Sequence, residues 1–332
     1  MENIFKFPQQ PNLYLYNRFK QRLKATDVAP ILQPLPFYFF GSGSSGNSVY
    51  LTRLHTLIDL GFPYSHYKEL NPNFFLDVDY LILTHEHSDH LNVSTLFKIL
   101  EMFPNVKILL SKRLYQVITN PLKDQNKISK RMTGNFHQRI DDLTHTYKSR
   151  FEIIEHPQTT IPLVTRHQTE FWLTPHFVKH GSITNMAIEI STLKYDIHML
   201  YASDLDHLLD PTGIDVINNR GLPSNYSSSL DPTDPQFNYP IDQLKFEPLK
   251  NPFNLMFLEA NYDKEILDPI LQKDPHNARA LGNKRHISEQ EAWKYVSLSL
   301  SSAGLFVPLH ASTTFGTLVQ DLTKQGDTKT RD

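Results

Sequence analysis

The sequence predicts an α+β fold on three observations. Short apolar runs of the kind that form buried strands recur along most of the 332 residues. Segments with helical spacing, such as residues 92–100, are interspersed among these runs. The composition is 39% hydrophobic and 20% charged, which is that of an ordinary globular protein with one large domain or two small ones.

The composition also limits the function classes. The net charge is −2, so no global basic field indicates nucleic-acid binding, although a local basic patch would be compatible with it. The chain has no cysteine, which excludes disulfides and thiolate chemistry. No signal-peptide pattern opens the chain, and no apolar run approaches the ~20 residues of a membrane span. We therefore expect a soluble, cytoplasmic protein with no membrane partner.

Residues 1–36 form an N-terminal extension ahead of the first strand-like run. Leu13, Tyr16, Phe19 and Leu23 recur at helical spacing, with basic residues between them. This spacing predicts a helix that packs on the domain. The alternative is an arm that reaches a second copy of the chain in a homodimer or covers its site.

Residues 37–40 and 49–51 are predicted strands joined by a glycine- and serine-rich turn over residues 41–48. The turn could hold a phosphate on its backbone amides, or its glycines could simply supply positive φ. No helix follows it, so it is not a P-loop. We take Ser44 and Asn47 as candidate substrate contacts.

A cluster of three histidines and an aspartate follows the strand predicted over residues 79–83. His85 and His87 are two residues apart, so on an extended backbone they point the same way and can hold one ion. Asp89 and His90 come as the chain turns, and they can face a second ion. Imidazole and carboxylate are the usual ligands of zinc and similar ions. Two such ions roughly 3.5–4 Å apart suit hydrolysis. The alternative to a metal site is a polar loop that contains three histidines by chance, which is the weaker interpretation.

Further elements are predicted between these motifs. Asn92 is the expected N-cap of the helix over residues 92–100. Residues 120–150 are polar and basic, which indicates an insertion or a solvated surface more than a contact with substrate. The remaining strands that carry polar residues near their ends are predicted over residues 56–61, 106–110, 151–155, 172–180, 185–190 and 197–204.

Three of these strand ends carry candidate functional residues. Asp59 could be an ordinary turn aspartate or a support for the histidine cluster. His180 ends its strand before a glycine-containing turn, and His176, on the same face, is more easily explained by a structural role. Asp204 ends an apolar strand, and Asp206 lies close to it. A capping aspartate is the alternative for Asp204.

Residues 208–248 are rich in proline, asparagine, serine and aspartate. A loop this long inside a domain is usually functional or disordered. We interpret it as a substrate lid, with Tyr226, Phe237 and Tyr239 as base-stacking candidates. The alternative is a surface loop that its aromatic residues anchor.

The last third of the chain adds polar residues beside two more predicted strands, over residues 255–259 and 304–309. Glu259 ends the first strand, and His310 ends the second. His286 precedes a predicted helix. Arg279, Arg285 and Ser312 could contact a substrate phosphate, although a solvated helix start explains the arginines nearly as well.

These motifs together resemble a known superfamily. His85-x-His87-x-Asp89-His90 matches the signature of metallo-β-lactamase-fold hydrolases. The Gly/Ser hairpin, residues 259–263 and the His286-x-Ser288 pair are similar to segments of the YycJ-like and RNase Z-like phosphodiesterases. The resemblance implies a four-layer αβ/βα sandwich over residues 37–332, with insertions at about 120–150 and 208–248.

The resemblance also implies a ligand set and its supports. Asp59 would support the metal loop, Asp204 would bridge two ions, and His286 would act as general acid oriented by Glu259. Arg285 stands where the motif usually has glycine, which is a departure from the pattern. The remaining ligands would be His85, His87 and His180 for one ion, and Asp89, His90 and His310 for the other.

The implied activity is a phosphodiesterase that uses two divalent ions, zinc or alternatively manganese. A metal-bound hydroxide, which Asp204 helps to hold, would attack phosphorus, and His286 would protonate the leaving oxygen. Asp89 would be a catalytic residue as well as a ligand. The expected substrates are cyclic nucleotides or the ends of DNA or RNA. The alternative activity is hydrolysis of a carbon ester, lactone or thioester. A metal-stabilised binding protein without turnover is a third possibility, which intact ligands for two ions disfavour.

Overall fold

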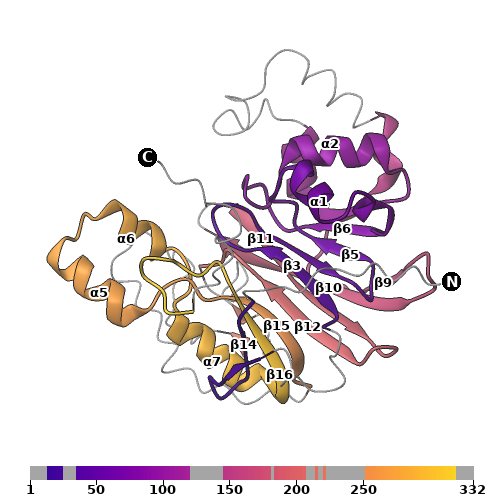
Figure 1. Cartoon of the computed structure of the whole chain (residues 1–332). Coiled ribbons are helices and arrows are strands. Elements are labelled where there is room, and N and C mark those ends of the chain that lie inside the picture. The colour runs from indigo at the N-terminus through magenta and orange to yellow at the C-terminus, as the bar shows by residue number, and fades with distance from the viewer. Residues whose placement is uncertain are drawn as a thin grey trace, which may run out of the picture.

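The computed structural model describes residues 13–24, 35–119, 145–180, 183–206, 214–215, 220–221 and 251–318. Within this part of the chain, two β-sheets pack face to face and helices cover their outer faces (Figure 1). The α+β class and the four-layer sandwich expected from the sequence are therefore confirmed. No helix among the described residues is long and apolar enough to cross a membrane.

The first sheet has six strands in sequence order. Its first two pairings are antiparallel, and the pairings from the third strand onward are parallel. The third and fourth strands therefore end at the same edge, where Asp59 and the residues after Leu83 follow them. The strands are β3 (Phe37–Gly41), β4 (Ser48–Leu51), β5 (Thr56–Ile58), β6 (Tyr80–Leu83), β7 (Lys107–Ser111) and β8 (Phe151–Ile154).

Helices cover the outer face of this sheet because their apolar sides meet its outward apolar residues, such as Leu81 and Leu110. They are α1 (Tyr64–Leu70), the 3₁₀ turn η3 (Phe74–Leu76), α2 (Val93–Met102) and α3 (Lys112–Thr119). Asn92 caps α2 as expected, because its side chain accepts from the backbone nitrogen of Thr95. A further 3₁₀ turn, η5 (Lys148–Arg150), leads into β8.

The second sheet has eight strands in the order β2-β1-β16-β15-β12-β11-β10-β9, of which β1 is Leu15–Tyr16 and β2 is Arg22–Leu23. The pairs β12–β15 and β15–β16 are parallel, whereas β10–β11 and β11–β12 are antiparallel. Strands β10, β12, β15 and β16 therefore all end at one edge. The bounds are β9 (Ile161–Val164), β10 (Glu170–His180), β11 (Ile183–Thr192), β12 (Ile197–Ala202), β15 (Phe253–Glu259) and β16 (Leu300–Leu309).

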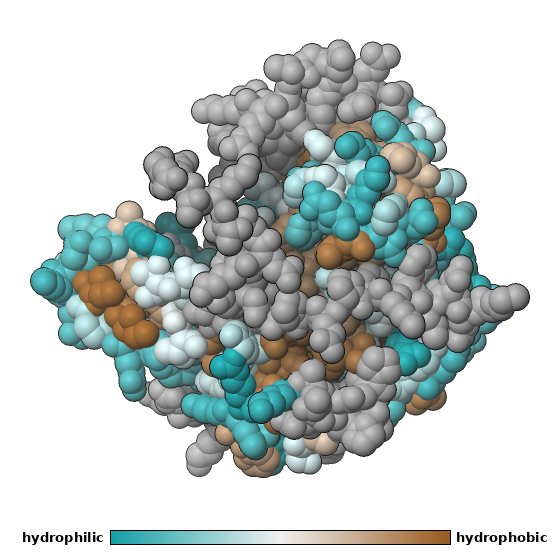
Figure 2. Space-filling view, in the orientation of Figure 1, coloured by the Kyte–Doolittle hydropathy of each residue, from teal (hydrophilic) through white to brown (hydrophobic). Residues whose placement is uncertain are grey.

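Three helices of the described part of the chain lie between β15 and β16. Helix α7 (Glu289–Ser299) packs on the outer face of the second sheet through residues such as Trp293 and Val296. Helices α5 (Lys264–Lys273) and α6 (Ala278–Asn283) form a separate lobe around Leu267 and Ala280. Figure 2 shows apolar surface on this lobe, which lies beside the segment leading to His286.

The main core lies between the two sheets. Each sheet contributes alternate side chains to it, because successive residues of a strand point to opposite faces. Phe37 of the first sheet meets Phe257 of the second edge to face, with ring centroids 4.9 Å apart. This packing fixes the two sheets relative to each other, so the strand ends of both sheets meet along one edge.

The prediction of a helix in the N-terminal extension is wrong. Instead, β1 (Leu15–Tyr16) pairs antiparallel with β16, and β2 (Arg22–Leu23) pairs with β1. Leu15 is buried between the sheets, while Tyr16 packs on Trp293 at the opposite face. Neighbouring residues that face opposite sides follow the period of a strand and not that of a helix.

The turn between β1 and β2 explains why a helix does not form. The side chain of Asn17 accepts from the backbone nitrogens of Phe19 and Gln21, which is an alternative to helical hydrogen bonds. Lys20 has a φ of 62°, outside the helical range. Phe19, which the helical pattern would bury, is 67% exposed.

Two expected insertions lie largely outside the described residues. The described parts of the first are residues 145–150, and those of the second are β13 (Ile214–Asp215) and β14 (Arg220–Gly221), which pair antiparallel. The lid candidates Tyr226, Phe237 and Tyr239 lie outside the described residues.

Candidate dinuclear metal centre

Candidate functional side chains converge where strands of both sheets end. Asp59 follows β5, Asp204 lies two residues beyond β12, and His310 follows β16. All three have left-handed backbone conformations, with φ of 58°, 54° and 50°. A non-glycine residue in this region stores strain of the order of 1–3 kcal/mol, and such residues cluster at functional sites. The chain therefore turns sharply at each of these strand ends and directs the side chains to one place.

Asp59 organises the histidine loop that follows β6. The side chain is fully buried, and its carboxylate accepts from the backbone nitrogen and hydroxyl of Thr84. It also accepts from Nδ1 of His90 at 2.7 Å and from the hydroxyl of Tyr201 at 3.0 Å. Because the Thr84 hydroxyl donates to Asp59, it accepts from Nδ1 of His85, which lies 3.0 Å away. Asp59 thereby fixes the orientation of both rings.

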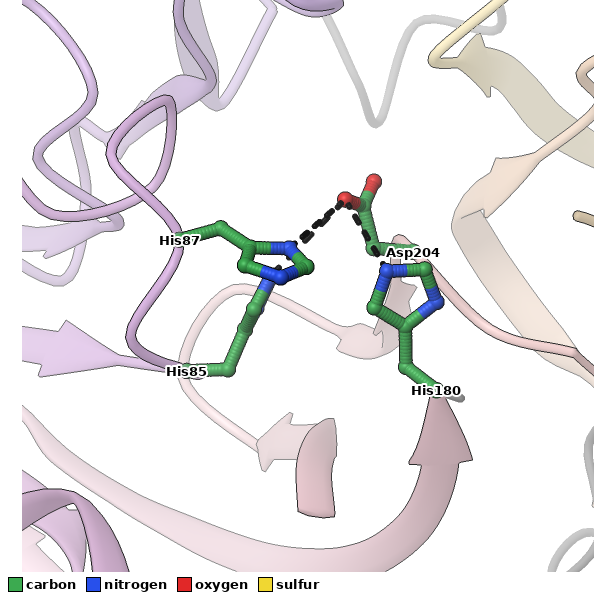
Figure 3. A group of neighbouring side chains, drawn as sticks. All are labelled: His85, His87, His180 and Asp204. Carbon is green, nitrogen blue, oxygen red and sulfur yellow. Dashed lines mark ion pairs between the residues drawn. The ribbon is translucent and has the colours of Figure 1, made fainter. Parts of the chain in front are cut away.

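The first candidate subsite contains His85, His87 and His180 (Figure 3). Their ring nitrogens face one oxygen of Asp204, Oδ2, at 3.7 Å from Nε2 of His85, 4.0 Å from Nδ1 of His87 and 3.9 Å from Nε2 of His180. The donor atoms of all four residues lie within 4.8 Å of one another. Three imidazoles and a carboxylate at this spacing form a donor set that zinc prefers.

The second candidate subsite faces the other oxygen of Asp204. Nε2 of His90 lies 3.4 Å from Oδ1, and Nε2 of His310 lies 3.7 Å from it. Asp89 Oδ2 lies 4.0 Å from Nε2 of His90 and 3.8 Å from Nε2 of His310. Each oxygen of Asp204 therefore belongs to a different group of side chains, which is the arrangement of a carboxylate that bridges two ions.

Ring nitrogens without a partner support metal binding at both subsites. Nε2 of His85 and Nε2 of His90 are buried and have no hydrogen-bond partner. In both rings Nδ1 donates to Thr84 or Asp59, so Nε2 is the nitrogen left to ligate a cation, and in the neutral ring of His85 it presents a lone pair. A buried lone pair without a donor is costly unless a cation takes it up. The residues present therefore fit a pair of divalent ions.

The charges in the cluster agree with this fit. Burial, reinforced by the neighbouring His90, holds the pKa of His85 well below its ordinary value, so its ring stays neutral. Burial would raise the pKa of Asp204, but His310 and His90 hold it well below its ordinary value. Burial would also lower the pKa of His90, but Asp204 and Asp59 raise it well above its ordinary value. The second proton of His90 therefore lies on Nε2, which faces Asp204, and a divalent cation would take the place of this proton.

Asn47 and Gly61 hold Asp89 in place. The backbone nitrogen of Asn47 donates to the carbonyl of Asp89 at 2.7 Å, and its side-chain amide donates to the same carbonyl and to Oδ2, each at 3.3 Å. Gly61 lies so close that a Cβ there would overlap the carbonyl oxygen of Asp89. Asn47, a candidate substrate contact, is buried and directed toward Asp89 instead of toward solvent.

His286 lies beside the second subsite. Its Nδ1 is 2.6 Å from Oε1 of the fully buried Glu259, and its ring stacks on His310 with centroids 4.9 Å apart. The other oxygen of Glu259 accepts from the backbone nitrogen of Leu205 at 2.8 Å, which ties it to the turn at Asp204. Burial would lower the pKa of His286, but the carboxylate of Glu259 outweighs it and raises the pKa to about 9. The ring is therefore protonated at neutral pH.

Several supporting residues were not predicted. Asp206 Oδ1 lies 3.7 Å from Nδ1 of His180, and the Asn185 amide donates to the Asp204 carbonyl at 2.8 Å. The Asn261 amide nitrogen donates to the His310 carbonyl at 2.8 Å. These contacts join residues far apart in the sequence, so spacing could not reveal them, although Asp206 stood close to the chosen Asp204.

Other candidates lie outside the cluster. Nε2 of His176 pairs with Glu189 at 3.2 Å on the second sheet, which agrees with the structural role expected for it. Ser44 and Arg285 are exposed. Arg279 donates to the Thr314 hydroxyl at 2.5 Å. The hydroxyl of Ser312 accepts from the backbone nitrogens of residues 314 and 315, so it caps a turn.

Comparison with known proteins gives similarity in fold alone. No protein-family model matches the chain, and no curated protein matches its sequence. The short form of human tRNase Z is 15% identical, with a TM-score of 0.46 over 83% of this chain and 92% of that chain. A diphosphatase from the PhnP family is 14% identical, with a TM-score of 0.37 over 84% and 87%. The metallo-β-lactamase-fold protein YhfI from Bacillus subtilis is 15% identical, with a TM-score of 0.38 over 85% and 96%.

Proposed function

We propose that this chain is a metal-dependent phosphodiesterase of the metallo-β-lactamase fold, with two bound ions and His286 as its general acid. His85, His87 and His180 would hold one ion, Asp89, His90 and His310 the other, and Asp204 would bridge them. The imidazole-rich donor set favours zinc, with manganese as the alternative. The proposed substrates are cyclic nucleotides or the ends of nucleic acids.

The ions, when bound, would act as Lewis acids that lower the pKa of a water molecule and neutralise charge on phosphate oxygens. The residues of the chain determine where this chemistry occurs. Asp204 is buried and ionised between the two histidine groups, so it would hold the ions at a fixed separation. Asp59 would keep the protons of His85 and His90 on Nδ1, away from the ligating nitrogens.

The observation that carries the proposal is the pair formed by His286 and Glu259. An alkoxide that leaves a phosphodiester needs a proton, because alkoxides are strong bases. The buried carboxylate 2.6 Å from Nδ1 keeps the His286 ring protonated at neutral pH, and the ring lies against His310 at the second subsite. A protonated imidazole beside a metal site is suited to donate that proton.

The experiment that tests the proposal compares two leaving groups in His286→Ala. Hydrolysis of a nucleotide phosphodiester, which releases an alkoxide, should slow by about 10²–10⁴-fold. Hydrolysis of bis(p-nitrophenyl) phosphate should slow much less, because p-nitrophenolate leaves without a proton. The unmodified protein and His286→Ala should bind the same number of ions by metal analysis, because His286 is not one of the proposed ligands. His176→Ala is the matched control, because this buried histidine pairs with Glu189 instead of lying at the centre.

Equal losses with both leaving groups would contradict a general-acid role for His286, and unchanged rates would exclude any catalytic role. A substrate panel then tests the phosphodiesterase assignment itself. It should contain cyclic mononucleotides, end-labelled DNA and RNA, and a carbon ester, lactone and thioester. Turnover of the carbon substrates alone would replace the proposed function with the alternative hydrolase.

A further inference from the structure

A second group of metal-ligating side chains lies at the opposite end of the sandwich. His55 precedes strand β5 and Asp59 follows it, so His55 lies at the edge away from the candidate dinuclear centre. Strand β10 likewise ends at His180, and His167 lies before its start. Asp77 follows η3 and lies beside both histidines. One donor atom from each of His55, Asp77 and His167 lies within 4.8 Å of the others.

We propose that His55, Asp77 and His167 form a third cation site, which takes a zinc-like transition metal and bridges the two sheets. His55 belongs to the first sheet's β4–β5 connection, and His167 belongs to the second sheet's β9–β10 turn. Two imidazoles and a carboxylate are a donor set for such an ion, with water completing the coordination. The site is independent of the proposed phosphodiesterase function.

The spacing of the first two donors suits a shared ion. Nδ1 of His55 lies 3.2 Å from Oδ1 of Asp77 and 3.1 Å from the Asp77 carbonyl oxygen, so it donates a proton to Asp77 that a bound ion would displace. Two ligands that each stand ~2.0–2.1 Å from a tetrahedral zinc ion are roughly 3.3 Å apart. The hydroxyl of Tyr50 donates to the other carboxylate oxygen, Oδ2, at 2.5 Å. This bond orients the Asp77 carboxylate and directs Oδ1 toward His55.

His167 supplies the third donor from an exposed position. Its ring stacks on that of His55 with centroids 4.1 Å apart and an angle of 24° between the planes. In this stack the lone pairs of the two rings run nearly parallel, so a shared ion requires the His167 ring to rotate. The side chain is exposed, so the ring can rotate into solvent when its stack on His55 breaks.

Hydrogen bonds and an ion pair already connect the backbone segments around the three residues. The carbonyl of His55 accepts from the backbone nitrogens of Asp79 and Tyr80. Arg166, next to His167, pairs with Asp79 and donates to the carbonyls of Leu76 and Val78 on both sides of Asp77. Three connections from two sheets are thus fixed together before any ion binds, which lowers the entropic cost of forming the site.

Zinc analysis after dialysis of the full chain against buffered Zn²⁺ tests the proposal. The unmodified protein should hold three ions per chain, and His167→Ala should hold two. The matched control is His156→Ala, which removes another exposed histidine, in the β8–β9 connection, and should leave three. His167 is exposed, so its removal should not impair folding, which circular dichroism would check.

The same measurement separates this proposal from the proposed function. In an Asp204→Ala background, one ion should remain, and adding His167→Ala should remove it. Two ions in the unmodified protein that His167→Ala leaves in place would overturn the third site while supporting the dinuclear centre. A single ion that His167→Ala removes would support the third site and contradict the dinuclear centre.

Discussion

Nδ1 of His90 donates to Oδ2 of Asp59 across 2.7 Å, and both side chains are fully buried. This contact joins the end of β5 to the loop after β6, so it holds a predicted metal ligand against a residue that binds no metal itself. It also leaves Nε2 as the free nitrogen, directed at Oδ1 of Asp204 3.4 Å away. The orientation of the second subsite therefore depends on one carboxylate behind it.

Asp59→Asn should weaken metal binding without removing a ligand. An amide is uncharged and has only one acceptor oxygen, so it cannot accept from Thr84, His90 and Tyr201 together, and its NH₂ group can present a donor to Nδ1 of His90. The expected loss is about 10–100-fold in affinity for zinc, as for other residues that orient metal ligands. Competition with a chelating dye measures it. Asp196→Asn, at an exposed turn with a φ of 49°, is the control and should bind as the unmodified protein does.

Glu259→Gln should move the pH profile of the reaction. A general acid must be protonated, so kcat for a substrate with an alkoxide leaving group should fall as pH rises through the pKa of His286. Glu259 raises that pKa to about 9, and bound cations pull it down, so the falling limb should lie at or below pH 9. Removing the carboxylate charge should shift this limb toward lower pH. A falling limb at the same pH in Glu259→Gln would show that Glu259 does not determine the pKa of the general acid.

Gly61→Ala should destabilise the fold and the second subsite together. A Cβ at this position would overlap the Asp89 carbonyl and the Asn47 amide, which are both backbone groups that cannot move aside. We expect a loss of about 1–3 kcal/mol in the free energy of unfolding, as for other overpacked sites. Gly282→Ala is the control, because its Cβ would meet nothing within 4 Å in α6, and it should be neutral or slightly stabilising. Urea denaturation compares the two, and equal stabilities would contradict the close approach.

Arg150→Ala should destabilise the helix that follows the metal loop. The guanidinium donates to the carbonyls of Leu100 at 2.6 Å, Phe103 at 2.7 Å and Val106 at 2.8 Å, where α2 ends. Losing these bonds leaves half-buried carbonyls without donors, at a cost of about 1–3 kcal/mol. Lys112→Ala breaks an ion pair in which both side chains are more than half exposed, so it should cost under about 1 kcal/mol. Thermal or urea denaturation of both variants provides the comparison.

The sequence was sufficient to predict candidate metal ligands where they lie close together or directly follow an apolar strand. The cluster from His85 to His90 lies within six residues after an apolar strand, so its spacing alone indicated a metal site. His180, Asp204 and His310 each stand at or just beyond the end of such a strand, and the resemblance selected them before the structure brought them together. The sheet order supplies the reason, because parallel strand ends share one edge.

The sequence was insufficient to predict the structure where one pattern fits both a helix and a hairpin, or where a contact joins residues far apart in the chain. Leu13, Tyr16 and Leu23 fit helical spacing, yet a hydrogen-bonded turn at Asn17 makes a hairpin of them. The supports Asp206 and Asn261 act across gaps of tens of residues, which no local period records.

Anomalous X-ray diffraction from zinc-loaded crystals, recorded at the zinc absorption edge, tests the central claim most directly. The account predicts two peaks roughly 3.5–4 Å apart on either side of Asp204, one near His85, His87 and His180 and the other near Asp89, His90 and His310. A single peak at Asp204, or paired peaks elsewhere in the protein, would contradict it.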